Sequence, residues 1–146
     1  MTENTPGAEP VEVDYKQLFT EIKTIAVVGY SDNPERAAHY VSQYLASKGY
    51  NIIAVNPRFK DGVDGFPCYP SLDAIPAGTP IDVIDVYRSP EAVPPVVDQA
   101  AKLVPLPKYF WMQPGAENPA AAQQALDQGM IPIMHACMMA AHKIWM

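Results

Sequence analysis

The stretch IAVVGYSDNPERAAHYVSQYLASKGYNIIAVNP, residues 25–57, contains two short apolar runs separated by an amphipathic segment. The runs at 24–29 and 51–55 are continuous and rich in β-branched residues, a pattern typical of strands buried on both faces of a parallel sheet. Between them apolar residues recur at helical spacing, and Gly49 is placed to end the helix. A strand, a helix and a second strand with short connections predict a parallel βαβ unit.

The alternation of strand-like and helix-like segments continues to the end of the chain. Further strands are predicted at 81–87, 108–112 and 131–134, and a very short strand at 66–69 must be at an edge because it contains Pro67. Helices or single helical turns are predicted at 15–23, 71–75, 94–103, 119–128 and 138–145. We therefore expect an α/β fold with a Rossmann-like, doubly wound parallel sheet of about five main strands plus the edge strand, and with helices on both faces.

The dipeptide Asn-Pro precedes two of the predicted helices, at 33–34 and at 118–119. Asparagine is a favoured N-cap residue, and proline is favoured at the first helical position because its missing N–H would have no helical partner there. Both pairs therefore predict a helix that begins at the proline. Further prolines directly follow predicted strands, which marks these connections as the carboxyl-terminal rim of the sheet, where open α/β folds bind ligands.

The chain has 146 residues, of which 16 are acidic and 10 basic, so its net charge is −6. This length predicts one domain, which we place at 15–146 after a flexible tail at 1–14. The negative balance argues against binding to nucleic acid or to an anionic membrane. The tail lacks the basic and apolar regions of a signal peptide, and two cysteines make no disulfide framework. We expect a cytoplasmic protein with free thiols.

The turn at 29–36 is a candidate phosphate-binding site, because it follows a buried strand and leads into a helix whose first N–H groups are unpaired. The dinucleotide fingerprint G-x-G-x-x-G is incomplete here. Only Gly29 matches it, and Ser31 and Pro34 stand at the other two glycine positions. An ordinary turn into a helix is the alternative interpretation.

The end of the second strand indicates which nucleotide is favoured. NAD sites place a carboxylate there to bind the ribose 2′-hydroxyl, whereas this chain continues Asn56-Pro57-Arg58-Phe59-Lys60. Two cations in place of a carboxylate favour a ligand with an extra ribose phosphate, such as NADP or coenzyme A. The cations that follow predicted strands, and that a parallel sheet places along one rim, are Arg36, Arg58, Lys60 and Arg88. Neighbouring acidic residues leave a solvated rim of mixed charge as the alternative.

Other catalytic or metal-binding chemistry has little support in the sequence. His135, Cys137 and His142 do not have the spacing of a structural zinc site. Ser31 lies outside the G-x-S-x-G motif of a nucleophilic serine. We therefore expect no metal site and no catalytic residues, and a ligand-binding domain rather than an enzyme.

Several short motifs occur in an order and spacing that resemble the small single-domain CoA-binding proteins of bacteria. These proteins are similar to the N-terminal CoA-binding domain of the succinyl-CoA synthetase alpha subunit. The matching motifs are VVGYSDNP at 27–34 with Arg36, VNP at 55–57, VYRSPEAVP at 86–94, WMQPG at 111–115 and MHACMM at 134–139. The resemblance extends from about Lys23 to the end of the chain.

The resemblance implies that the chain binds coenzyme A or an acyl-CoA through the 3′-phospho-ADP moiety, at the carboxyl-terminal rim of the sheet. The residues that it implies for this site are Gly29, Tyr30, Ser31, Asn33, Pro34, Arg36, Asn56, Pro57, Arg58, Lys60, Val86, Tyr87 and Arg88. In the synthetase a separate domain and subunit supply the ligase chemistry, so the resemblance extends to binding and not to catalysis. An NADP-linked reductase and a non-catalytic protein-interaction module with a vestigial pocket remain the alternatives.

The chain departs from the family pattern near its end. His135-Ala136 stands where the family usually has an acidic-basic pair before the last cysteine, and Ala141 stands where an acidic residue often precedes the final histidine.

Overall fold

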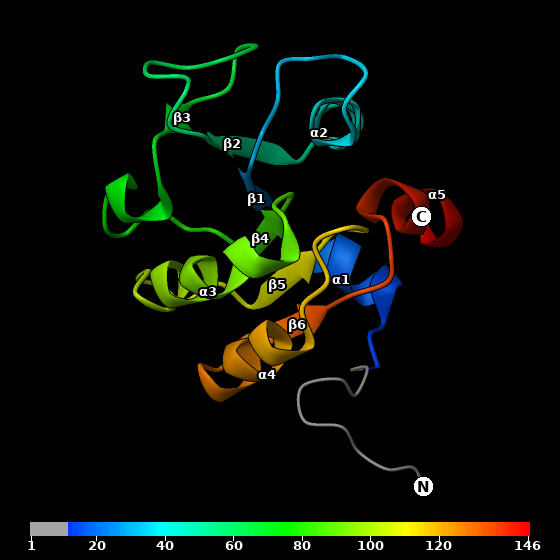
Figure 1. The fold of residues 1–146 in the computed structure, drawn as a ribbon. Helices are drawn as coiled ribbons and strands as arrows, with labels where there is room; N and C mark the ends of the chain where they lie inside the picture. The colour runs from blue at the N-terminus through cyan, green and yellow to red at the C-terminus, as the bar shows by residue number, and fades with distance from the viewer. Residues whose placement is uncertain (1–11) are drawn as a thin grey trace, which may run out of the picture.

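The structure, a computed structural model, describes residues 12–146. Its described strands form one six-stranded parallel sheet in the order β3-β2-β1-β4-β5-β6 (Figure 1). The strands are β1 Thr24–Val28, β2 Asn51–Val55, β3 Cys68–Tyr69, β4 Val83–Val86, β5 Tyr109–Met112 and β6 Ile131–Ile133. The predicted fold is confirmed, including the short edge strand, which is β3.

Helices cover both faces of the sheet (Figure 1). They are α1 Tyr15–Glu21, α2 Ala37–Ser47, α3 Val93–Ala101, α4 Pro119–Asp127 and α5 Met138–Trp145, with single 3₁₀ turns at Leu72–Ala74 and Pro90–Ala92. The apolar sides of α3 and α4 pack on one face, and those of α1, α2 and α5 pack on the other. Successive β1 residues therefore alternate between two cores, with Ala26 in one and Val27 in the other, which explains why the strand is apolar from Ile25 onward.

The two Asn-Pro pairs differ in what they do. Asn118 caps α4 as predicted, since its side chain accepts a hydrogen bond from the Ala121 N–H at 3.0 Å. The prediction for Asn33 was wrong, because α2 begins at Ala37. The Asn33 side chain instead accepts from the Glu35 N–H at 3.0 Å, and its carbonyl accepts from the Arg36 N–H at 3.0 Å. These local bonds close a turn ahead of the helix and lengthen the β1–α2 connection.

The start of the chain is only partly described. Residues 1–11, on which most of the predicted flexible tail falls, lie outside the described residues. Asp14 is the N-cap of α1, and its side chain accepts from the Gln17 N–H at 3.0 Å. No helix within residues 12–146 is long and apolar enough to cross a bilayer.

Candidate functional site

The strand order creates a crevice at the carboxyl ends of β1 and β4. These strands are neighbours, and the connection after β1 leads to α2 on one face while the connection after β4 leads to α3 on the other (Figure 1). The two connections diverge from adjacent strands and leave an opening between them, which is the topological switch point where open α/β sheets bind ligands.

Gly29 allows the two strands to approach closely at this point. It has a φ of +89°, and a Cβ built on it would lie 2.2 Å from the carbonyl oxygen of Tyr87. Its N–H donates to the Val55 carbonyl at 2.9 Å, and the Tyr87 N–H donates to the Val28 carbonyl at 2.8 Å. The turn after β1 is thus bonded to β2 while its flank lies against β4, and only glycine fits there.

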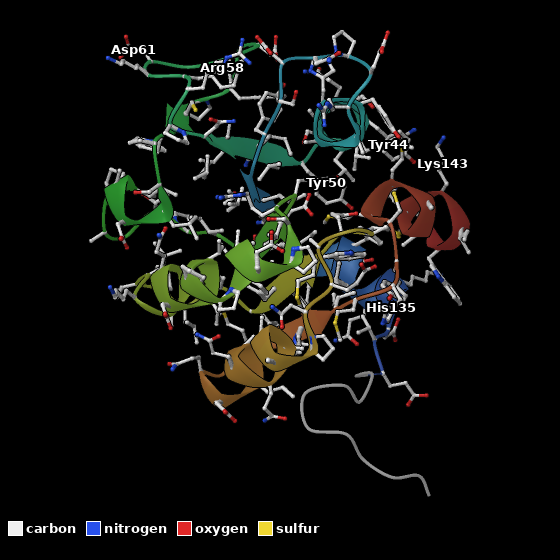
Figure 2. The ribbon with its side chains drawn as sticks, viewed as in Figure 1. Tyr44, Tyr50, Arg58, Asp61, His135 and Lys143 are labelled. Atoms are coloured by element: carbon white, nitrogen blue, oxygen red, sulfur yellow. The ribbon has the colours of Figure 1, made fainter. Side chains whose placement is uncertain are left out.

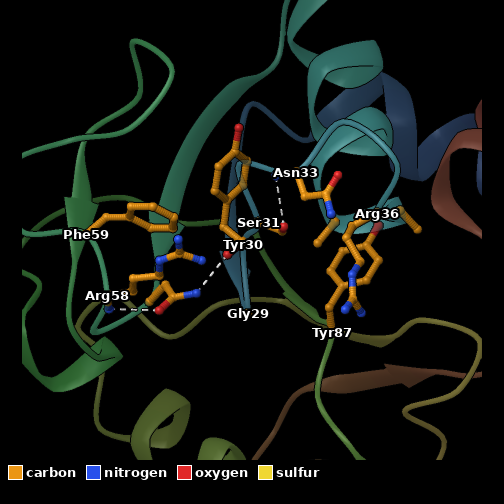
Figure 3. Close-up of a pocket in the computed structure, with 11 residues that line it drawn as sticks. Gly29, Tyr30, Ser31, Asn33, Arg36, Arg58, Phe59 and Tyr87 are labelled. Carbon is orange, nitrogen blue, oxygen red and sulfur yellow. Dashed lines mark hydrogen bonds between the residues drawn. The ribbon is translucent and has the colours of Figure 1, made fainter.

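A cavity of about 410 Å³ opens beside this turn (Figure 3). It brings together residues from the β1–α2 connection, the start of α2, the segment after β2 and the end of β4. The lining residues are Gly29, Tyr30, Ser31, Asn33, Arg36, Ala37, Ala38, Asn56, Arg58, Phe59 and Tyr87. We call this the polar cavity, because backbone N–H groups and two arginines face it.

A second cavity of about 350 Å³ adjoins the first and shares Gly29 and Asn56 with it. Valines and prolines make up half of its lining residues, so we call it the apolar cavity. Its lining residues are Val28, Gly29, Val55, Asn56, Pro57, Pro70, Ser71, Arg88, Val96 and Gln99. The two cavities lie on either side of the point where β1 ends.

Three of the residues predicted for the site line neither cavity. Pro34 and Lys60 are exposed, and Val86 is fully buried in the core against α3 and α4. Conversely, sequence reasoning missed Ala37, Ala38 and Phe59 in the polar cavity. A signal for Phe59 was present, since an aromatic residue between two cations directly after a strand is suited to the rim of a nucleotide site.

Asn56 connects the turn after β1 to the turn after β2. Its side-chain amide donates to the Tyr30 carbonyl at 2.8 Å, and its side-chain oxygen accepts from the Arg58 N–H at 2.8 Å (Figure 3). The Phe59 N–H donates to the backbone carbonyl of Asn56 at 3.3 Å. Asn56 therefore sets the spacing between the two polar-cavity walls.

Several hydrogen-bond donors at the polar cavity have no protein partner. Within residues 12–146, the backbone N–H groups of Ser31, Ala37 and Ala38 donate no hydrogen bond. Arg36, the N-cap of α2, makes no side-chain capping bond. The first turn of α2 therefore presents free donors at the positive end of its dipole, an arrangement that attracts an anion.

The four cations predicted for the rim are exposed. The ion pairs within the described residues join other groups: His39 to Asp64, Lys108 to Glu21 and His135 to Glu117. The Arg58 guanidinium lies over the Phe59 ring, 5.5 Å from its centroid. The cations are therefore available to an anionic ligand.

Buried polar groups lie behind the wall formed by Tyr87. Asp85 on β4 is fully buried; one of its oxygens accepts from the Gln113 side-chain amide at 2.6 Å, and the other has no partner among the described residues. Burial raises the pKa of Asp85 to about 7, against a smaller lowering by the Gln113 hydrogen bond. Burial also raises the pKa of Tyr87, whose hydroxyl has no partner within the described residues and stays protonated.

Cys68 and Cys137 are free thiols, and residues 12–146 contain no group of three or more metal-ligating side chains. His135 and Cys137 lie directly before α5, and His142 lies within it. The His142 ring is hydrogen-bonded to the Tyr44 hydroxyl.

Known proteins share both the sequence pattern and the fold. The chain is 35% identical to the protein YneT of Bacillus subtilis (strain 168) over 136 residues. This alignment covers 92% of this chain and 96% of YneT. A solved structure from Pyrococcus horikoshii OT3 superposes with a TM-score of 0.84 at 35% identity, covering 99% of each chain. An ADP-forming acetate–CoA ligase of Archaeoglobus fulgidus is 30% identical over 80 residues, which are 55% of this chain and 11% of the ligase.

A family model described as a CoA binding domain matches residues 23–143, which include the whole sheet and every residue that lines the two cavities. The predicted resemblance is thereby confirmed at the level of the family. The chain belongs to the CoA-binding domain family.

Proposed function

We propose that the chain binds coenzyme A or an acyl-CoA through its 3′-phospho-ADP moiety, across the two adjoining cavities. The observation that carries the proposal is the pairing of an anion-attracting cavity with an apolar one at the shared residues Gly29 and Asn56. A nucleotide requires the same pairing, because its charged phosphates are joined through a ribose to a flat apolar base. Membership of the family supports coenzyme A as that nucleotide.

The polar cavity suits the diphosphate. The free N–H groups of Ser31, Ala37 and Ala38 and the Arg36 side chain face the same space. The apolar cavity suits adenine, since a planar base would lie between Pro57 and Pro70 on one side and Val96 on the other. A ligand that spans the two cavities would pass Gly29 and Asn56, the two residues that line both.

Arg58 is the residue that we assign to the ribose 3′-phosphate. It lines the polar cavity two positions after the shared residue Asn56, and its guanidinium forms no ion pair within the described residues. Lys60, the other cation after β2, lines neither cavity. A hydrogen bond to a charged group contributes about 1.5–3 kcal/mol, which corresponds to roughly 10–100-fold in the dissociation constant.

The test is calorimetric titration of the wild-type protein and two charge-matched variants with CoA and dephospho-CoA. We expect R58Q to weaken CoA binding about 10–100-fold and to leave dephospho-CoA binding unchanged. K102Q, which removes a cation from the exposed end of α3, is the control and is expected to bind both ligands as the wild type does. Equal weakening of both ligands by R58Q would contradict the assignment of Arg58.

Thermal shifts with NADP and NAD complete the test. A ligand at 100 times its Kd adds about 2.7 kcal/mol, which raises the melting temperature of a domain of this size by roughly 5–10 °C. We expect this shift with CoA. A shift with NADP and none with CoA would overturn the proposal in favour of an NADP-linked reductase, and no shift with any of these nucleotides would favour an interaction module.

A further inference from the structure

The segment after β2, residues 57–67, is a loop with one antiparallel bridge between Val63 and Phe66, and its residues Arg58 and Phe59 line the polar cavity; we call it the 57–67 hairpin. Its tip is a two-residue turn: the Val63 N–H donates to the Phe66 carbonyl at 3.0 Å, and the Phe66 N–H donates back to the Val63 carbonyl at 2.8 Å. Asp64 and Gly65 between them have φ values of +53° and +83°. Two successive positive φ angles indicate a type I′ turn, for which Asp-Gly is a favoured pair.

The tip of this hairpin is bonded to the turn after β1. The Tyr30 hydroxyl donates to an Asp64 carboxylate oxygen at 2.6 Å, and Tyr30 accepts in turn from the Gln43 side-chain amide at 3.3 Å. His39 Nδ1 lies 3.5 Å from the same carboxylate oxygen and 3.1 Å from the Ser31 carbonyl. Asp64 therefore contacts both the β1–α2 connection and α2, although it belongs to neither.

The Tyr30 side chain is oriented for this contact by its packing. It is fully buried, and the Phe66 ring meets it edge-on with centroids 5.8 Å apart. Burial and then the hydrogen bond to Asp64 raise the pKa of Tyr30, so its hydroxyl stays protonated and remains a donor.

Arg58 and Phe59 lie between the two points at which this hairpin is attached. Asn56 holds its base through the Arg58 N–H, and Asp64 holds its tip through Tyr30. The Arg58 side chain contacts only the neighbouring Phe59 ring among the interactions of the described residues, so its position follows from the backbone that carries it.

We propose that the Tyr30–Asp64 hydrogen bond is a positioning contact that holds the 57–67 hairpin over the polar cavity and thereby sets the preference for a ligand with a ribose 3′-phosphate. The inference rests on the proposed function and adds to it the residues that determine specificity. Tyr30 and Asp64 act through Arg58 and need no contact with the ligand. A purely structural role for Tyr30 is the alternative, and it would alter stability without altering the choice between ligands.

The first experiment measures the ratio of the dissociation constants for dephospho-CoA and CoA in the wild type and in Y30F. Removal of the hydroxyl keeps the buried ring and releases the hairpin tip. We expect the ratio to fall about tenfold, because CoA uses the Arg58 position and dephospho-CoA does not.

The control variant is Y44F. Tyr44 on α2 shares a hydrogen bond of 2.8 Å with His142 on α5, and Figure 2 shows it on the opposite side of the molecule from Arg58. Y44F therefore removes a comparable hydroxyl contact between elements without touching the hairpin. We expect the ratio of dissociation constants in Y44F to match that of the wild type.

Two substitutions of Asp64 separate its hydrogen bond from its charge. D64N keeps an oxygen that accepts from Tyr30 and suits the same turn, because Asn-Gly is a strong type I′ pair. D64G keeps the positive φ and removes the acceptor. We expect D64N to retain the wild-type preference for CoA and D64G to lose it as Y30F does, although both lack the carboxylate.

Hydrogen exchange without ligand gives an independent measurement. The amides of Val63 and Phe66 should exchange at least about tenfold faster in Y30F and D64G than in the wild type. A wild-type preference for CoA that survives in Y30F, or that falls equally in Y44F, overturns the inference and leaves the proposed function intact. A wild type that does not bind CoA overturns the proposed function and the specificity assignment with it.

Discussion

After β5 and β6 the polar side chains of the rim bond to the protein itself, whereas after β1 and β2 the rim cations form no ion pair and the first N–H groups of α2 have no partner within residues 12–146. On the β5–β6 side, the Gln113 side chain bonds Asp85 and the Met138 N–H, and the Trp111 ring donates to the Ala136 carbonyl at 2.8 Å. On the β1–β2 side, the cations of the polar cavity are unpaired among the described residues. Free donors thus mark the β1–β2 side, the half of the rim that we propose binds the ligand; we call it the binding half and the β5–β6 side the structural half.

The two Asn-Pro pairs show the difference at the smallest scale. In the structural half Asn118 caps α4, and its amide also donates to the Pro90 carbonyl at 2.8 Å. In the binding half Asn33 bonds within its own turn, so the first turn of α2 keeps its free N–H groups. The same dipeptide provides a hydrogen-bond acceptor for the first turn of α4 but provides none for the first turn of α2.

In the structural half, one buried carboxylate oxygen of Asp85 has no hydrogen-bond partner among the described residues. We expect substitution of Asp85 to have the largest effect on stability. Its pKa is raised from 3.8 to about 7, so the folded protein binds a proton more tightly than the unfolded chain does. Its contribution to the free energy of unfolding therefore falls as the pH rises from about 4 to about 7, by on the order of 4 kcal/mol. Denaturant unfolding across this range should show that D85N abolishes the fall and is the more stable protein at pH 8.

The comparison between wild type and D85N isolates Asp85 from other titrating groups. Burial lowers the pKa of His142, which affects stability in the opposite sense, since that contribution is lost as the pH falls. His142 is present in both proteins and cancels in the difference. Parallel stability curves for the two proteins would show that folding does not raise the pKa of Asp85.

A glycine in each half tests whether close strand approach is special to the binding half. Gly29 and Gly115 have φ values of +89° and +98°, but a Cβ at Gly115 would meet nothing within 4 Å. We expect G115A to lower the free energy of unfolding by about 1–2 kcal/mol through backbone strain alone. G29A should lower it by about 3–4 kcal/mol, because the new methyl group meets the Tyr87 carbonyl. Equal losses in denaturant unfolding would mean that β1 and β4 separate there without cost.

The asparagines give the smallest expected difference. N118A should lower the free energy of unfolding by about 1 kcal/mol, because it removes the cap of α4. N33A should lower it by only a few tenths of a kcal/mol, because Asn33 caps no helix and its turn keeps the bond from Arg36 to the Asn33 carbonyl. A loss in N33A as large as in N118A would show that the turn before α2 contributes to stability as a helix cap does.

Most of the fold could be predicted because the signals for it are local. Continuous apolar runs identified the buried strands, and Pro67 identified the edge. The start of α2 could not be placed, because an Asn-Pro pair is compatible both with a helix cap and with a turn. Only the three-dimensional structure shows which of the two Asn33 forms. The parallel arrangement of the strands also predicted that the residues following them lie along one rim. The structure has this parallel sheet, and the polar cavity contains residues that follow β1, β2 and β4.

The rest of the site depends on contacts between distant segments. Asp64 lies 34 positions after Tyr30, and the sequence presents it only as one acidic residue that weakens a basic rim. The family resemblance implied Val86 for the site, but side chains alternate along a strand and Val86 points into the core with α3 and α4. Sequence position indicates which turn reaches the rim but not which side chain faces the ligand.

The crevice between β1 and β4 has a consequence for how such a protein can evolve. It arises from connections that leave adjacent strands toward opposite faces, so it does not depend on any one side chain. Substitutions in the two neighbouring turns can exchange one ligand for another, or abolish binding, while the opening persists. A lineage with this strand order therefore inherits the place for a ligand even through periods in which selection for that ligand is absent.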